Sequence, residues 1–163
     1  MLFRSQLDPL FPETPVRLGN FVVDDGEIGF KILAGVWGDT GGLITLPKPP
    51  SGYLGSSTLW TGNAVARVAW SAVVPPGRYR VSIFNPIYLT LITRATVRVF
   101  HDGGESAFFL NQRSGVAGWN NLGVFRFDSA PARVEMGNES TISGRLPDGG
   151  LNVDAVRFEE IVP

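Results

Sequence analysis

The stretch from Leu110 to Asp128, LNQRSGVAGWNNLGVFRFD, places planar polar side chains next to a tryptophan. Gln112 and Arg113 precede a glycine-containing turn, and Trp119 follows it. Sugars are bound by flat aromatic rings, while amide, guanidinium and carboxylate groups hydrogen-bond their hydroxyls. The same groups can brace a hairpin, because amides and guanidiniums also bond loop carbonyls. For these three residues we favour the bracing interpretation.

Aromatic residues in loops are stronger sugar-binding candidates. Residues 38–63 are rich in glycine and proline and read as a long loop, the kind of segment that often carries function. Trp70 ends an inward-facing alternation, so we predict that it belongs to the core. The candidate carbohydrate-binding residues are therefore Tyr53, Trp60, Tyr88, Trp119, Gln112 and Arg113.

A carboxylate inside an apolar segment suggests a second kind of candidate site, one that could bind a metal ion. Asp154 lies within LNVDAVRFEEI, and a buried carboxylate needs backbone N–H groups, an arginine or a cation as a partner. Asp24, Asp25 and Glu27 could add hard oxygen ligands for calcium. No segment matches a defined calcium-binding loop. A calcium site at Asp24, Asp25 and Asp154 is thus one alternative, and no other cofactor is predicted.

Catalytic groups are scarce in the sequence. His101 is the only histidine, there is no cysteine, and no Gly-x-Ser-x-Gly elbow exists to present a nucleophilic serine. The carboxylates of Asp24–Asp25 and of Glu159–Glu160 are adjacent, so on a strand they point to opposite faces rather than across one glycosidic bond. The sequence predicts a protein that is not an enzyme.

Composition and charge exclude further classes of protein. The 163 residues suit one domain, and the net charge of −1 comes without any basic stripe, which argues against nucleic-acid binding. No apolar segment approaches the roughly 20 residues of a membrane span. The N-terminus lacks the apolar core of a signal peptide, so we expect export by another route, assembly inside a cell, or a processed chain.

Hydrophobic residues alternate with period two, between Gly, Pro and Asn turns, and no helical period is sustained. In PPGRYRVSIF, for example, Tyr79, Val81 and Ile83 are predicted to point inward and Ser82 outward. RATVRVFHDGGESAFF predicts a hairpin that turns at an Asp-Gly pair. Eight or so short strands indicate an all-β fold, an antiparallel β-sandwich of jelly-roll type over residues 20–163.

Residues 1–19 are predicted to form an extended, proline-rich N-terminal arm, because three prolines exclude a helix. The arm is also apolar, so it should pack on its own sandwich or on a neighbouring subunit. The segment 87–93, IYLTLIT, is unusually apolar for a connection and suggests a protein contact. The predicted assembly residues are Leu7, Leu10, Phe11, Ile87, Leu89 and Leu91.

The order of motifs resembles a known family. The motifs that carry the resemblance are VVDDGEIGF, a lone tryptophan, GYLGSS, ARVAW with PPGRYRV, TVRVFHDGG, LNQR with GWNNLGVFRF, and VDAVRF. In this order they are similar to the golvesin C-terminal domain, which also occurs in xanthan-lyase-type secreted proteins. The resemblance spans about residues 21–159. It implies a non-catalytic, carbohydrate-binding-like β-sandwich in extracellular, cell-surface or virion proteins.

Two functions follow as hypotheses. The first is a structural subunit of a virion, filament or surface layer, which forms homo-oligomers through the arm and the apolar segment. The alternative is a carbohydrate-binding module that attaches a surface or secreted assembly to polysaccharide. The arm and the 87–93 segment favour the first.

Overall fold

The computed structural model describes residues 19–39, 58–129, 131–138 and 148–162, and every structural statement below concerns these ranges. They contain twelve strands and no helix. The strands are β1 (Asn20–Val23), β2 (Phe30–Ala34), β3 (Gly38–Asp39), β4 (Leu59–Thr61), β5 (Arg67–Ala72), β6 (Gly77–Asn85), β7 (Ala95–His101), β8 (Gly104–Leu110), β9 (Gly118–Phe127), β10 (Ala132–Gly137), β11 (Leu151–Val153) and β12 (Val156–Glu160).

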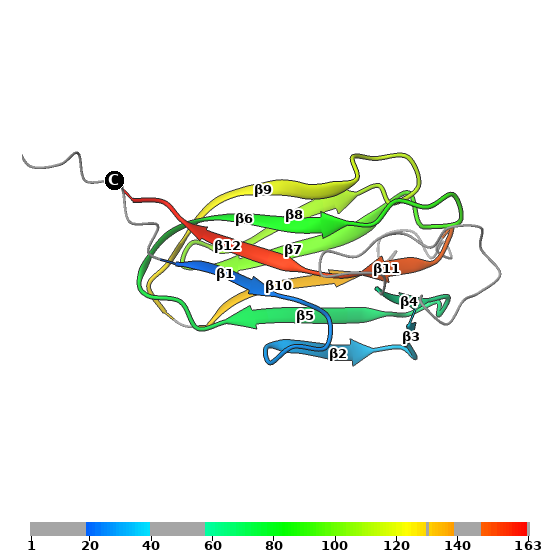
Figure 1. Cartoon of the computed structure of the whole chain (residues 1–163), viewed down its shortest axis with the longest axis horizontal. Coiled ribbons are helices and arrows are strands. Elements are labelled where there is room, and N and C mark those ends of the chain that lie inside the picture. Colours follow the sequence, from blue (N-terminus) through cyan, green and yellow to red (C-terminus); the bar gives the residue numbers. More distant parts are fainter. Residues whose placement is uncertain (1–18, 40–57, 130, 139–147, 163) are drawn as a thin grey trace, which may run out of the picture.

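The strands form two stacked antiparallel sheets, which confirms the predicted β-sandwich (Figure 1). One sheet has the order β1-β12-β6-β9 and the other β2-β5-β10-β7-β8. A small third sheet, β11-β4-β3, lies at one end. None of the described residues forms a helix that could cross a membrane.

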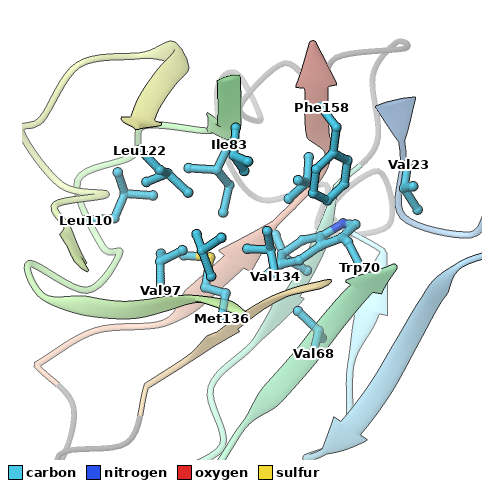
Figure 2. Close-up of a cluster of buried hydrophobic side chains, with 14 of the residues drawn as sticks. Val23, Val68, Trp70, Ile83, Val97, Leu110, Leu122, Val134, Met136 and Phe158 are labelled. Carbon is cyan, nitrogen blue, oxygen red and sulfur yellow. The ribbon is translucent and has the colours of Figure 1, made fainter. Parts of the chain in front are cut away.

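Alternating side chains from both sheets fill the core, as period-two patterning predicts. Figure 2 shows Trp70 and Val134 from one sheet facing Phe158 from the other. The β7–β8 hairpin pairs His101 with Gly104 around the predicted Asp-Gly turn. The strand faces that the sequence assigned to Tyr79, Val81 and Ile83 are therefore correct, since all three are buried.

Two local predictions were wrong. The segment LNVDAVRFEEI predicts one strand that is apolar on both faces, but residues 151–160 form two strands, because the chain leaves the small sheet at Asp154–Ala155 and enters the four-stranded sheet as β12. This change of sheet explains why both faces of the segment are apolar. Ser82 was predicted to face solvent but is only 3% exposed, next to a register shift between β6 and β9.

The predicted assembly residues divide into two groups. Leu7, Leu10 and Phe11 lie outside the described residues. Leu91 is buried and forms a β-bridge with Gly150, so its assignment to an assembly surface was wrong; it packs inside its own domain. Of the three assembly residues in segment 87–93, Ile87 is half-buried and only Leu89 is exposed.

Candidate functional site

Backbone hydrogen bonds join three connecting segments at the end of the sandwich that carries the small sheet (Figure 1). The N–H of Tyr88 donates to the carbonyl of Gln112 (3.0 Å), and the N–H of Gln112 donates to the carbonyl of Ile92 (3.0 Å). The N–H of Ile92 in turn donates to the carbonyl of Gly150 (2.8 Å). We call this region the loop end: residues 85–94, 111–117 and 148–152, together with β4.

Gln112 braces the loop end from within. Its side chain is fully buried, and its Nε2 donates to the Asn152 carbonyl (2.6 Å) while its Oε1 accepts from the Asn152 N–H (3.0 Å). The amide thus pairs with a backbone segment as a neighbouring strand would. The inclusion of Gln112 among the sugar-contacting residues was therefore wrong, because no part of its side chain reaches solvent.

Arg113 ties the remaining segments together. Its Nε donates to the Leu91 carbonyl (2.9 Å), its Nη2 donates to the Asp148 carbonyl (2.5 Å), and its Nη1 lies 3.6 Å from the Asp148 carboxylate. The Thr93 hydroxyl and N–H donate to the same carboxylate. The Thr93 hydroxyl hydrogen bond, with Arg113 adding to it, lowers the pKa of Asp148, so this brace stays ionic at neutral pH.

Three further polar residues of the brace were missed in the sequence. Asn85 Nδ2 donates to the carbonyls of Asn111 (3.1 Å) and Val116 (3.0 Å). Asn152 makes its two bonds to Gln112 through its backbone N–H and carbonyl, and Asp148 accepts the bonds described above. Asn85 is a buried amide at the end of β6. Because a buried amide needs partners, an amide at this strand end is the signal by which the sequence could have revealed Asn85. Asn152 takes part through its backbone alone, so its side-chain type carries no such signal.

Two of the predicted aromatic residues belong to the loop end. Trp60, on β4, is half-buried and packs so closely on Gly150 that a Cβ there would lie 2.3 Å from its Nε1. Tyr88 is half-buried, and no hydrogen bond or ring contact holds its ring among the described residues. Tyr53 lies outside the described residues.

Trp119 is held by the protein itself. The Arg157 guanidinium lies 4.4 Å from its ring centroid, and the Phe84 ring meets it edge-on at 5.4 Å and 85°. Arg157 is also paired with Glu159 (3.3 Å). A ring already stacked by a cation offers less surface to a sugar, so this geometry favours the bracing role.

The three carboxylates singled out as calcium ligands converge. Asp24, Asp25 and Asp154 each offer an oxygen atom, and these atoms lie within 4.8 Å of one another. Asp24 and Asp25 follow β1 and Asp154 precedes β12, so the pairing of β1 with β12 brings them together. Asp24 and Asp154 are buried. Glu27 is not part of this group; its carboxylate accepts the Asp24 N–H (3.1 Å).

His101 meets a hydroxyl but does not form a catalytic triad. Its Nδ1 accepts the Gly103 N–H (3.1 Å), so the neutral ring carries its proton on Nε2, 2.9 Å from the Ser106 hydroxyl. An Nε2–H donor cannot take a proton from the serine. The Asp102 carboxylate instead accepts the Asp128 N–H (2.7 Å).

Known proteins share this fold. The "Xanthan lyase" of Bacillus sp. (strain GL1) is 27% identical over 154 residues, which cover 93% of this chain and 15% of that protein. The solved Paenibacillus xanthan lyase superposes with a TM-score of 0.69 at 22% identity, over 88% of this chain and 13% of that one. This chain therefore spans less than a sixth of the length of either relative.

A single domain of a larger protein also matches. The CBM36-1 domain of a multidomain xylanase from the hindgut metagenome of Trinervitermes trinervoides gives a TM-score of 0.55 at 9% identity, over 89% of this chain and all of that domain. Residues 16–160 match the golvesin C-terminal domain. The motifs of the sequence, the sandwich and this match agree, and the chain belongs to the golvesin C-terminal domain family.

Proposed function

We propose that this domain is a non-catalytic carbohydrate-binding module that attaches to a polysaccharide outside the cell or at its surface. The observation that carries the proposal is the fold shared with a complete carbohydrate-binding module, the CBM36-1 domain, over the whole of that domain. The proposal replaces self-assembly as the preferred function. Leu91 is turned into the core, so the apolar segment gives assembly little support.

The loop end is the proposed sugar-binding region. It presents Trp60 and Tyr88 on segments that Gln112 and Arg113 hold in place. Pre-organised loops bind sugars with a smaller loss of conformational entropy, which suits a weak, shallow ligand contact.

Affinity gel electrophoresis of the full chain against a panel of soluble polysaccharides tests this function. We expect at least one polysaccharide to retard the protein. Tyr88→Ala should weaken that binding by about tenfold, since a lost aromatic contact is worth roughly 1 kcal/mol or slightly more. Phe100→Ala is the matched control, at a half-buried ring near the far end of β7 from the loop end, and should bind as the parent does. Binding to no polysaccharide, or a loss that follows Phe100 instead of Tyr88, would contradict the proposal.

We also propose that Asp24, Asp25 and Asp154 hold a calcium ion that ties β1 to the turn before β12. Three carboxylates this close repel one another, and burial of two of them removes the solvent that would screen the repulsion. A hard divalent cation relieves it with ligands that calcium prefers. The ion would serve the stability of the sandwich and carry no chemistry.

Thermal unfolding in calcium and in chelator measures this effect. Saturation to about 100 times the Kd stabilises a protein by about 2.7 kcal/mol, which for a domain of this size raises Tm by roughly 5–10 °C. Asp154→Asn should abolish the shift, whereas Asp128→Asn, at an exposed aspartate, should keep it. Equal Tm values with calcium and with chelator would show that protons, not a cation, relieve the repulsion.

A further inference from the structure

The outer edge of strand β8 is open. β8 is the last strand of the sheet β2-β5-β10-β7-β8, and it pairs on one side only, with β7. Backbone groups alternate in direction along a strand, and the bond from the Asn138 N–H to the Ala66 carbonyl fixes this alternation across the whole sheet. Every second residue of β8 therefore turns its N–H and carbonyl away from β7, and no hydrogen bond among the described residues occupies these groups. The residues concerned are Glu105, Ala107 and Phe109.

The other edges of the two large sheets are blunted in the described part of the chain. Proteins usually shorten or bulge an edge strand, because free N–H and carbonyl groups invite unwanted pairing. β1 has four residues, β2 has a register irregularity between Ile32 and Ala34, and β9 has one where it meets Val81–Ser82. β8 has seven residues in unbroken register. An edge left in this state is suited to the addition of a strand from another chain.

The side chains of this edge carry opposite charges at its two ends. Glu105 follows the hairpin turn, and its side chain is 46% exposed although it pairs with Arg98 (3.2 Å). Phe109, near the other end, is 54% exposed, and the Arg94 guanidinium lies 3.7 Å from its ring centroid. Arg94 is exposed and has no carboxylate partner among the described residues. Ala107 lies between the two ends, exposed and with a side chain of a single methyl group.

We propose that a second copy of this chain pairs with β8 in antiparallel orientation, with the two-fold axis at Ala107, so that the protein is a homodimer. Residues with outward-facing backbone groups then meet as pairs that exchange two hydrogen bonds each. Ala107 faces its own copy at the axis, where a small side chain avoids a clash. Glu105 faces Phe109 of the partner subunit, which brings its carboxylate beside the partner's Arg94. A salt bridge therefore crosses the interface on either side of the axis.

The charge pattern selects a second copy and this register. A parallel pair would place each Glu105 beside the other and each Arg94 beside the other, and like charges that face one another destabilise a strand pair. Sliding the antiparallel pair by two residues, one repeat of the pleat, separates Glu105 from the partner's Arg94. A two-fold axis supplies the complementary charges by symmetry, because the same patch serves on both subunits.

The dimer would hold two loop ends far apart. Phe109 lies near the end of β8 from which residues 111–117 lead into the loop end, whereas Glu105 lies near the hairpin turn at the opposite end of the sandwich (Figure 1). Antiparallel pairing therefore sends the two loop ends to opposite ends of the joined sheet, where they can bridge two polysaccharide chains. This consequence rests on the proposed function, but the pairing through β8 does not.

Sedimentation velocity of the full chain over a range of concentrations tests the pairing. We expect a dimer with a Kd of about 10–100 μM, because one strand pair is a small interface. Ala107→Pro removes an outward-facing N–H that the monomer does not use, and it should raise the Kd at least about tenfold. Val124→Pro is the matched control, on the edge strand β9, where the N–H of Val124 faces away from β6 as the Arg126 carbonyl does. It should dimerise as the parent does.

An exchange of charges tests the register without altering the backbone. Glu105→Arg alone and Arg94→Glu alone each set like charges against one another across the axis, so each variant should self-associate about tenfold more weakly at low salt. An equal mixture of the two variants carries opposite charges at both crossings and should form a heterodimer about as readily as the parent forms its homodimer. This mixture decides the question if Ala107→Pro fails to fold, which unfolding curves reveal.

Several results overturn the inference. A monomer at every concentration up to about 300 μM does so, because pairing this weak would have no use. A dimer that Ala107→Pro leaves intact, or that Val124→Pro weakens equally, places the interface elsewhere, and so does a mixture that associates no better than its two components. These results leave the proposed function standing, since retardation by polysaccharide is measured separately. A chain that dimerises through β8 but binds no polysaccharide rejects the proposed function alone.

Discussion

Replacing Gln112 by alanine is expected to destabilise the domain by about 3 kcal/mol. The substitution removes two buried hydrogen bonds, each worth about 1 kcal/mol, and leaves the Asn152 N–H and carbonyl without their partner in a dry site. It also opens a cavity where the fully buried side chain had been. Urea unfolding followed by circular dichroism measures the loss as a lower midpoint at unchanged slope.

Two further variants separate the contributions. Gln112→Glu keeps the shape but exchanges the Nε2 donor for a buried charge, so we expect it to be at least as damaging as alanine. Asn121→Ala, at an exposed amide that accepts one bond from the Gly123 N–H, should cost less than about 1 kcal/mol. A loss as small for Gln112→Ala as for this control would mean that the loop end is not braced through the amide.

The same residue shows what can and cannot be predicted from sequence. Hydrophobic alternation predicted the sandwich and most inward-facing residues, because a strand with one buried face has a local pattern of period two. Whether a polar residue such as Gln112 faces a ligand or a distant backbone depends on a contact with Asn152, forty residues away along the chain. No local pattern encodes such a contact.

The sequence predicted which carboxylates could bind a cation, but not that strand pairing brings them together. Asp24 and Asp154 were paired as potential ligands because both offer hard carboxylate oxygens and Asp154 lies in an apolar segment, yet their distance depends on β1 pairing with β12. The gathering of Arg67, Arg98 and Arg133 on one side of a sheet was not predicted, since these arginines come from three separate strands, each of ordinary charge. The net charge of −1 concealed it, and only strand register gathers those side chains on one side of a sheet.

Replacing Trp70 by alanine should have the largest effect of any single change proposed here, a loss of about 4–5 kcal/mol. Trp70 is fully buried between the sheets (Figure 2). Its ring packs on Phe30 at a centroid distance of 5.7 Å. Truncation of a buried tryptophan to alanine costs about 3–5 kcal/mol through lost burial and the cavity that remains. A loss of this size approaches the whole stability of a typical domain.

Trp70 also fixes the turn that carries Asp154, because its Nε1 donates to the Asp154 carbonyl (2.9 Å). Trp70→Phe keeps much of the ring and removes this bond, so we expect a loss of about 1–2 kcal/mol and a smaller calcium-induced rise in Tm. Trp37→Ala is the control: Trp37 is half-buried and donates to the Ala34 carbonyl, away from Asp154. If Trp70→Phe leaves the calcium response at its parental size, the core does not position the carboxylates, and the pairing of β1 with β12 does so alone.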